Sequence, residues 1–296
     1  MRIPYKRSTG SEKLSMKSIC WKGYYMTNEL NELEVREIKN LAKEKLGLCS
    51  KTNDIIGTQI FSILSMYARV IYYPLGQEAP WGFTRISGSR DDAALEKPFV
   101  AINSSISMDR QVFAAAHELY HIWFEQNPDI LPADLLNEQN KEVNEKKANR
   151  FAAEFLVSEK LLCQEIELYQ IQEITIKNIL QLAALFTVPY RTMVKRLYEI
   201  RRITEAQQII FLNETEESIE IYSRKYSILK QAADERVTLD NLTELAVEAY
   251  EKGYITYEKL EYLLEFSNLI PADLGIKKND SYAFPSDDEL ADIMEE

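Results

Sequence analysis

The chain has 296 residues, 46% of them hydrophobic and 10% aromatic, which excludes a disordered protein and allows one large domain or two to three small ones. A formal net charge of −12 opposes nucleic-acid binding unless basic side chains gather in one place. Three scattered cysteines form no CxxC pair, which excludes a disulfide framework. No stretch approaches the roughly 18 apolar residues of a membrane helix, and no apolar run follows the basic start, so we expect a cytoplasmic protein.

The first quarter of the chain predicts helix followed by a short strand. We expect residues 1–28 to be irregular and residues 28–48 to form a helix, because their apolar side chains recur at helical spacing up to Gly47. Residues 54–76 predict a helix that runs into a strand and ends at the Pro74 to Gly76 turn.

The next segments predict a small sheet and two long helices. Residues 82–90 and 97–105 are rich in β-branched and aromatic side chains between turn residues, and we expect them to be strands of a small antiparallel sheet. Helices are expected from about Arg110 to Gln126 and over residues 137–158.

The rest of the chain predicts helices. Residues 175–203 resemble a helix–turn–helix, with the turn at Thr187 to Pro189. The whole is therefore expected to be α+β and mostly helical. We expect the following units: 1–54, irregular and helical; 55–165, a core that contains the small sheet and the two long helices; 166–205, a helix–turn–helix-like segment; 206–278, a helical C-terminal extension; and 279–296, an acidic, mobile tail.

The stretch "AAAHELYHIWFEQ" contains His117 and His121, the two histidines of the entire chain. Residues four apart lie one turn apart on the same side of a helix, so both imidazoles can point at one metal ion. Glu118 is placed for proton transfer to or from a water molecule there. This H-E-x-x-H pattern is typical of Zn²⁺ sites, although it also occurs by chance, and two core histidines are the alternative.

A catalytic zinc site needs a third protein ligand, and the sequence has no further histidine and no nearby cysteine. The carboxylate candidates that follow the histidines are Glu125, Glu138, Glu142, Glu145 and Glu154. We favour Glu145, because the small residues Ala148 and Ala152 on its helix permit a close approach to the histidine helix. Glu125 is interpreted as a solvated helix end, and Glu154 lies on roughly the opposite face from Glu145. Asn149, one turn after Glu145, is expected to bind the second ring nitrogen of a ligand histidine.

The segments "RQVFAAAHELYHIWFE" and "EKKANRFAAEFLVS" resemble the ImmA/IrrE family of metallopeptidases, over roughly residues 55–205. The matching positions are His117, Glu118, His121, Glu145, Ala148, Asn149, Phe151, Ala152, Ala153 and Leu156. Two positions depart from the family pattern: Tyr120 stands where glycine is common, and Ser158 where proline is common.

The resemblance implies that residues 55–165 form a zincin-like metallopeptidase core. Such a core has a site of two histidines and one glutamate that holds zinc, with Glu118 activating a water molecule. It also implies a protein substrate, since family members cut or inactivate helix–turn–helix repressors and thereby release stress, phage-defence or mobile-element genes. Manganese is an alternative metal, because two histidines and a carboxylate bind either ion.

Peptide hydrolysis also needs a place for the substrate and a donor for the oxyanion. The predicted strand around Val100, Ile102 and Asn103 could hold the substrate as an added β-strand. The candidates for the oxyanion donor are Tyr72, Tyr73, Arg85 and Arg110.

Two other functions stay open at this stage. The protein could bind a repressor without cutting it, with the metal as a structural staple. It could also bind DNA through residues 175–203, which contain six basic residues and only one acidic residue. We favour the alternative that these residues form two core helices that pack on the peptidase domain. A role of residues 242–267 in sensing a partner or signal is a further possibility, beside that of a helical hairpin that caps the fold.

Overall fold

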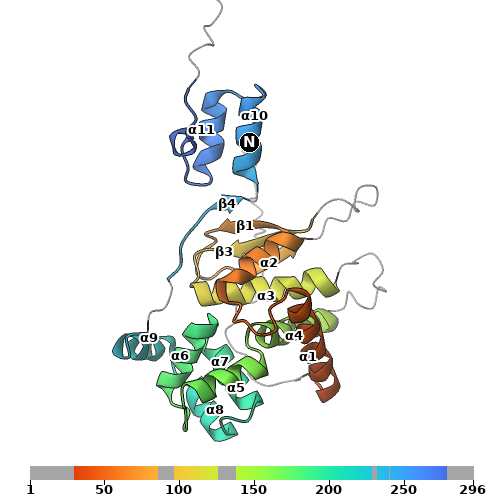
Figure 1. Cartoon of the computed structure of the whole chain (residues 1–296), viewed down its shortest axis with the longest axis vertical. Coiled ribbons are helices and arrows are strands. Elements are labelled where there is room, and N and C mark those ends of the chain that lie inside the picture. The colour runs from red at the N-terminus through yellow and green to blue at the C-terminus, as the bar shows by residue number, and fades with distance from the viewer. Residues whose placement is uncertain (1–29, 86–96, 126–137, 229–231, 240, 279–296) are drawn as a thin grey trace, which may run out of the picture.

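Helices form most of the chain, and one small sheet lies among them (Figure 1). The computed structural model describes residues 30–85, 97–125, 138–228, 232–239 and 241–278. In chain order the elements are α1 (Glu32–Leu48), the 3-10 turn η1 (Gly57–Gln59), α2 (Ile60–Tyr67), β1 (Arg69–Tyr73), β2 (Gly82–Arg85), β3 (Phe99–Asn103), α3 (Met108–Phe124), α4 (Glu138–Leu156), α5 (Glu159–Leu168), α6 (Ile176–Phe186), α7 (Tyr190–Glu199), α8 (Glu205–Leu212), α9 (Glu216–Lys225), β4 (Thr238–Leu239), α10 (Leu242–Glu251), α11 (Tyr257–Glu265) and η3 (Pro271–Leu274).

The predicted α+β class is confirmed, and so is the order of the predicted helices and strands. α1 begins four residues later than expected because Asn31 caps it: its side chain accepts from the Glu34 amide, and the Glu34 carboxylate accepts from the Asn31 amide. The expected irregular segment 1–28 and the mobile tail 279–296 lie outside the described residues. None of the helices in the described ranges combines the length and the apolar character that a membrane crossing requires.

The sheet is mixed, so the expectation of a purely antiparallel sheet was wrong. Its strand order is β2-β3-β1-β4, with β1 and β3 parallel and the other two pairs antiparallel. The chain passes from β1 to the outer strand β2 and then returns, so that β3 enters the gap between them in the direction of β1. Alternation of side chains shows that a segment is a strand but carries no information about the direction of its neighbour.

One face of the sheet packs against α2 and α3, which lie along it (Figure 1). The inward side chains of β1 and β3 alternate with outward ones, and they are Val70, Tyr72, Val100 and Ile102. α3 runs through the middle of the core, and eleven of its residues are buried, from Gln111 to Ile122. A helix that is covered on nearly all sides holds its polar side chains in fixed positions.

Residues 175–203 pack as core helices, as favoured over a DNA-binding function. α6 and α7 meet at Thr187, whose φ of 53° ends α6 in a left-handed cap. Most of the expected inward side chains are buried: Leu180, Leu182, Ala183, Val194 and Leu197, with Leu185 partly buried against the same core. Arg196, one of the six basic residues of this segment, is buried and therefore cannot contribute to a basic surface patch.

Arg196 joins α7 to the end of α4. Its guanidinium donates two hydrogen bonds to the Glu154 carboxylate, at 2.9 and 2.7 Å, and two to the carbonyl oxygen of Val157. Glu199 and Arg150 complete the ion-pair group. A guanidinium matches a carboxylate in this two-pronged geometry and also neutralises the carbonyl end of a helix.

The C-terminal part adds a strand and a helical hairpin. β4 extends the sheet beside β1, and the hairpin of α10 and α11 stands beyond it (Figure 1). The two helices are joined at Gly253, whose φ of 73° lies in the left-handed region that favours glycine. The hairpin has a small core of its own around Ala246, Leu260 and Leu264.

The buried ion pair yields a stability prediction. Arg196→Ala should lower the free energy of unfolding by about 3–5 kcal/mol, because it leaves the Glu154 carboxylate buried without its main partner. Arg202→Ala is the matched control, since Arg202 is 41% exposed and 4.0 Å from Glu167, and it should change stability by less than about 0.5 kcal/mol. Urea unfolding of both variants checks this, and equal losses would contradict a structural role for Arg196.

Candidate metal centre

The two histidines of α3 point at each other across one helical turn. The Nε2 atoms of His117 and His121 are 3.0 Å apart, and the ring centroids are 4.9 Å apart. The His117 side chain is 9% exposed and that of His121 is 13% exposed. The pair therefore lies at the boundary of the core, within reach of a ligand from outside.

α4 brings Glu145 to the same point. One Glu145 carboxylate oxygen is 3.2 Å from His117 Nε2, and the other is 3.9 Å from His121 Nε2. Ala148 and Ala152 of α4 are fully buried, and their small side chains suit the close packing of α4 against its neighbours, α3 among them. Among the described residues, these three side chains form the one group whose donor atoms all lie within 4.8 Å of one another.

An aromatic cluster fixes how α3 and α4 lie against each other. Phe151 of α4 contacts Tyr120, Trp123 and Phe124 of α3, with ring centroids 5.6 to 5.8 Å apart. Phe155 adds a further contact to Trp123. Tyr120, one of the two departures from the family pattern, is part of this cluster and packs edge-on against His121. The other departure, Ser158, caps α5 by accepting from the Leu161 amide.

The outer nitrogen of each imidazole has an acceptor beside it. His117 Nδ1 donates to Asn149 Oδ1 at 2.9 Å, the contact that the sequence predicted. His121 Nδ1 donates to Glu125 Oε2 at 2.8 Å. The interpretation of Glu125 as a solvated helix end was wrong. Its i, i+4 spacing from His121 keeps Glu125 away from the candidate metal position but brings its carboxylate to the outer nitrogen of the His121 ring.

These contacts make the inner atoms a good fit for a cation. Since both Nδ1 atoms donate, both Nε2 atoms carry lone pairs, and these face each other and the Glu145 carboxylate. Three convergent lone pairs repel unless a positive charge lies between them. Ligands about 2.0–2.1 Å from a tetrahedral zinc ion lie roughly 3.3 Å apart. The distances between the three donor groups, 3.0 Å between the two Nε2 atoms and 3.2 and 3.9 Å from these atoms to the Glu145 oxygens, are close to this value.

Glu118 lies next to the cluster but does not belong to it. It is 5% exposed, and its Oε2 accepts a hydrogen bond from the Thr84 hydroxyl of β2 at 2.7 Å. Burial raises the pKa of the Glu118 carboxyl, although the nearby histidines and the Thr84 hydrogen bond oppose this in part. A carboxyl group whose pKa is raised accepts a proton more readily than an ordinary glutamate, which suits a role in proton transfer.

The other acids and the oxyanion candidates lie elsewhere or are not described. Glu154 pairs with Arg196, on the far side of α4. Tyr72 is covered by the Arg236 guanidinium at 3.7 Å, and Arg110 pairs with Glu216 at 3.2 Å. Tyr73 is 48% exposed at the end of β1. The side chains of Glu138, Glu142 and Arg85 lie outside the described part of the chain.

The expectation that the β3 strand receives the substrate was wrong. β3 lies between β1 and β2, so both of its hydrogen-bonding edges are occupied. Val100, Ile102 and Asn103 are fully buried, and the Asn103 side chain holds the loop after β1 through Leu75 and Gly76. Among the described strands, β2 is an outer strand, and it lies against α3.

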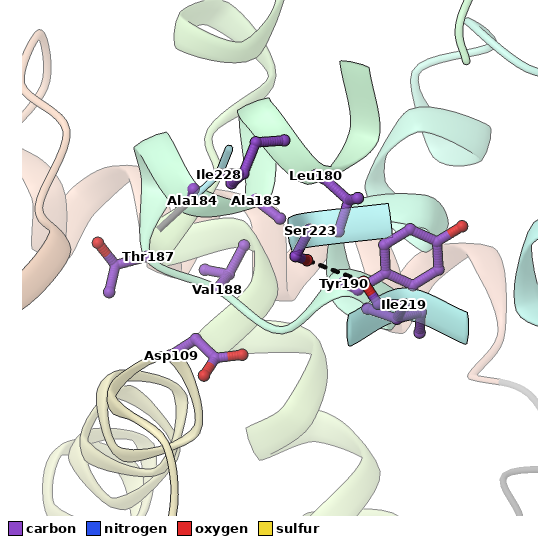
Figure 2. Close-up of a pocket in the computed structure, with 10 residues that line it drawn as sticks. All are labelled: Asp109, Leu180, Ala183, Ala184, Thr187, Val188, Tyr190, Ile219, Ser223 and Ile228. Carbon is purple, nitrogen blue, oxygen red and sulfur yellow. Dashed lines mark hydrogen bonds between the residues drawn. The ribbon is translucent and has the colours of Figure 1, made fainter. Parts of the chain in front are cut away.

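A separate cavity of about 90 Å³ lies beside the first turn of α3 (Figure 2). Asp109 in the first turn of α3 lines it, together with residues of α6, α7 and α9. None of the candidate metal ligands lines this cavity, so it is separate from the candidate metal centre.

Comparisons with known proteins match part of the chain to a family model. Residues 67–198, under half of the chain, match the family model Peptidase_M78, the IrrE N-terminal-like domain. No curated protein matches the chain. A solved structure of a Mycobacterium tuberculosis transcriptional regulator is similar at 15% identity, over 56% of this chain and 48% of that chain. The match spans about half of the regulator's length, and its TM-score of 0.40 is too low to indicate a shared fold.

The Glu125 contact predicts how the binding of a zinc ion at this candidate centre would depend on pH. Burial alone lowers the pKa of His121, but the Glu125 hydrogen bond and the charges of Glu125, Glu118 and Glu145 outweigh this and raise it above 6.5. Protons should therefore begin to displace zinc above pH 6.5 as the pH falls. Glu125→Gln should shift this loss to lower pH and weaken binding at pH 8 by about 10–100-fold.

Zinc titrations across pH 5 to 8 measure both effects. Glu167→Gln is the control, because Glu167 is 74% exposed and lies on α5. If Glu125→Gln gave the wild-type pH curve, the contact to His121 would have no influence on zinc binding.

Proposed function

We propose that residues 67–198, which match the IrrE N-terminal-like family model, form a metallopeptidase domain of the ImmA/IrrE family, and that the protein is a zinc-dependent endopeptidase that cuts a helix–turn–helix repressor. The observation that carries the peptidase proposal is the meeting of His117, His121 and Glu145 with Glu118 beside them. The repressor as substrate is supported by the resemblance to the family.

The three donor side chains would hold the metal, and each has a separate support. Asn149 orients His117, Glu125 orients His121, and the α3–α4 packing places Glu145. When bound, zinc supplies a Lewis acid that polarises the substrate carbonyl and makes water acidic. Three protein ligands leave one coordination position for chemistry, whereas structural zinc sites use four.

Glu118 is the proton carrier in this proposal. Its carboxylate takes a proton from the water that attacks the peptide carbon and delivers it to the amine nitrogen as the C–N bond breaks. Its burial fits this task, because a raised pKa brings the carboxyl closer to the pH at which it must exchange protons in both directions.

The outer edge of β2 is the place for the substrate. A peptide that adds to this edge makes main-chain hydrogen bonds to β2 and lies beside Glu118, which β2 contacts through Thr84. An added strand leaves both ends of the peptide free to continue, which fits cleavage within a chain rather than at its end.

The structure favours this proposal over the two alternatives. A regulator with a structural metal has no use for a buried Glu118 beside a three-ligand cluster. A DNA-binding function of residues 175–203 is disfavoured because Arg196 is buried in an ion pair, and Arg191 donates to carbonyl oxygens of the α8–α9 connection. Manganese remains the alternative metal, since the same ligands suit it.

Metal content and cleavage by one variant test the proposal. Glu118→Gln should keep about one zinc per chain, because Glu118 is not a ligand, and should lose about 10²–10⁴-fold in peptide cleavage, because it removes the proton carrier. His121→Ala should lose both zinc and cleavage. Mass spectrometry measures the metal, and a library of fluorescence-quenched peptides measures cleavage. Wild-type cleavage by Glu118→Gln would refute the mechanism, and a metal-free wild type after zinc addition would refute the site.

A further inference from the structure

Two residues of β2, Thr84 and Gly82, lie against the Glu118 carboxylate. Thr84 donates its hydroxyl hydrogen to Glu118 Oε2 at 2.7 Å. Gly82, two residues earlier on the same face of the strand, lies against the other carboxylate oxygen: a Cβ on Gly82 would stand 3.2 Å from Glu118 Oε1. Phe83 between them points to the opposite face and is 52% exposed.

The two positions do different things to the carboxylate. Thr84 supplies a directional hydrogen bond, which in a buried place is costly to lose and therefore selects one orientation of the carboxylate plane. Gly82 supplies space: with a Cβ at this position, Glu118 Oε1 and the Ala101 carbonyl would both be in tight contact. The sequence alone gives no sign of this pairing, because Thr84 and Glu118 are 34 residues apart.

We infer that Thr84 and Gly82 are positioning residues that hold the Glu118 carboxylate toward the metal centre. This inference rests on the proposed function. Neither residue touches the candidate ligands in a described contact, and both act through Glu118.

The arrangement also links substrate binding to the position of the proton carrier. The backbone of β2 would receive the peptide on its outer edge, while its Thr84 side chain holds Glu118. Because β2 is held in register by β3, with Thr84 opposite Val100 and Gly82 opposite Ile102, the peptide and the carboxylate are aligned by one rigid element. Glu118 is thus aligned relative to the scissile bond before the substrate arrives.

The test compares Thr84→Val, which keeps the shape and removes the hydroxyl, with Thr84→Ser, which keeps the hydroxyl. Thr84→Val should lower kcat by about 10–100-fold on the fluorescence-quenched peptides, with KM and zinc content unchanged. Thr84→Ser should recover most of this loss. Thr238→Val is the matched control, because Thr238 is exposed on β4 at the opposite edge of the same sheet, and it should leave kcat unchanged. Gly82→Ala should also lower kcat.

A second measurement does not depend on activity. The visible absorption of the protein loaded with cobalt(II) instead of zinc reports the charge beside the open coordination position. Thr84→Val should shift this spectrum toward that of Glu118→Gln, whereas Thr84→Ser and Thr238→Val should give the wild-type spectrum.

The outcomes separate the two proposals. If the wild type binds neither zinc nor cobalt, the proposed function fails and the positioning role fails with it. If the wild type binds metal and Thr84→Val matches it in both kcat and cobalt spectrum, while Glu118→Gln differs, the positioning role alone is wrong. If the peptides are not cut by any variant, the cobalt spectra decide in the same way.

Discussion

The close packing of α3 against α4 is the contact on which the candidate centre depends. His117 and His121 come from one helix and Glu145 from the other, so the ligand atoms meet only while the two helices keep their distance. The aromatic cluster around Phe151 holds α4 against α3, and the fully buried Ala148 and Ala152 suit close packing of α4. In a core packed to this density, a larger side chain at either alanine would move a carboxylate away from two imidazoles.

Charge explains why the centre needs so many supporting contacts. Glu118, Glu125 and Glu145 converge on two histidines, and burial makes each uncompensated charge expensive. Each group is therefore tied to a partner: Glu125 to His121, Asn149 to His117, and Glu118 to Thr84. The remaining lone pairs all face inward, which makes a bound cation the natural completion of the site.

Helix α7 supports α4 at its C-terminal end, away from Glu145. Arg196 of α7 bonds to Glu154 and to the Val157 carbonyl, where α4 ends, while Glu145 lies near the start of the described part of α4. The basic residues expected to form a DNA-binding patch are thus partly used to brace the helix that carries the third ligand.

The elements of the fold and most of the centre could be predicted because both follow from local periodicity. His117 and His121, and likewise Glu145 and Asn149, share a helix face by their i, i+4 spacing alone. The direction of β3, the burial of Arg196 and the contact of Thr84 with Glu118 could not be predicted, because each depends on partners 30 or more residues away. Glu125 was missed for another reason: its spacing was read correctly, but which histidine nitrogen faces outward depends on Glu145, on another helix. By itself the sequence determined which side chains share a face, since that repeats every turn of a helix. Only the tertiary structure decided which faces meet, because packing of the whole core selects those pairs.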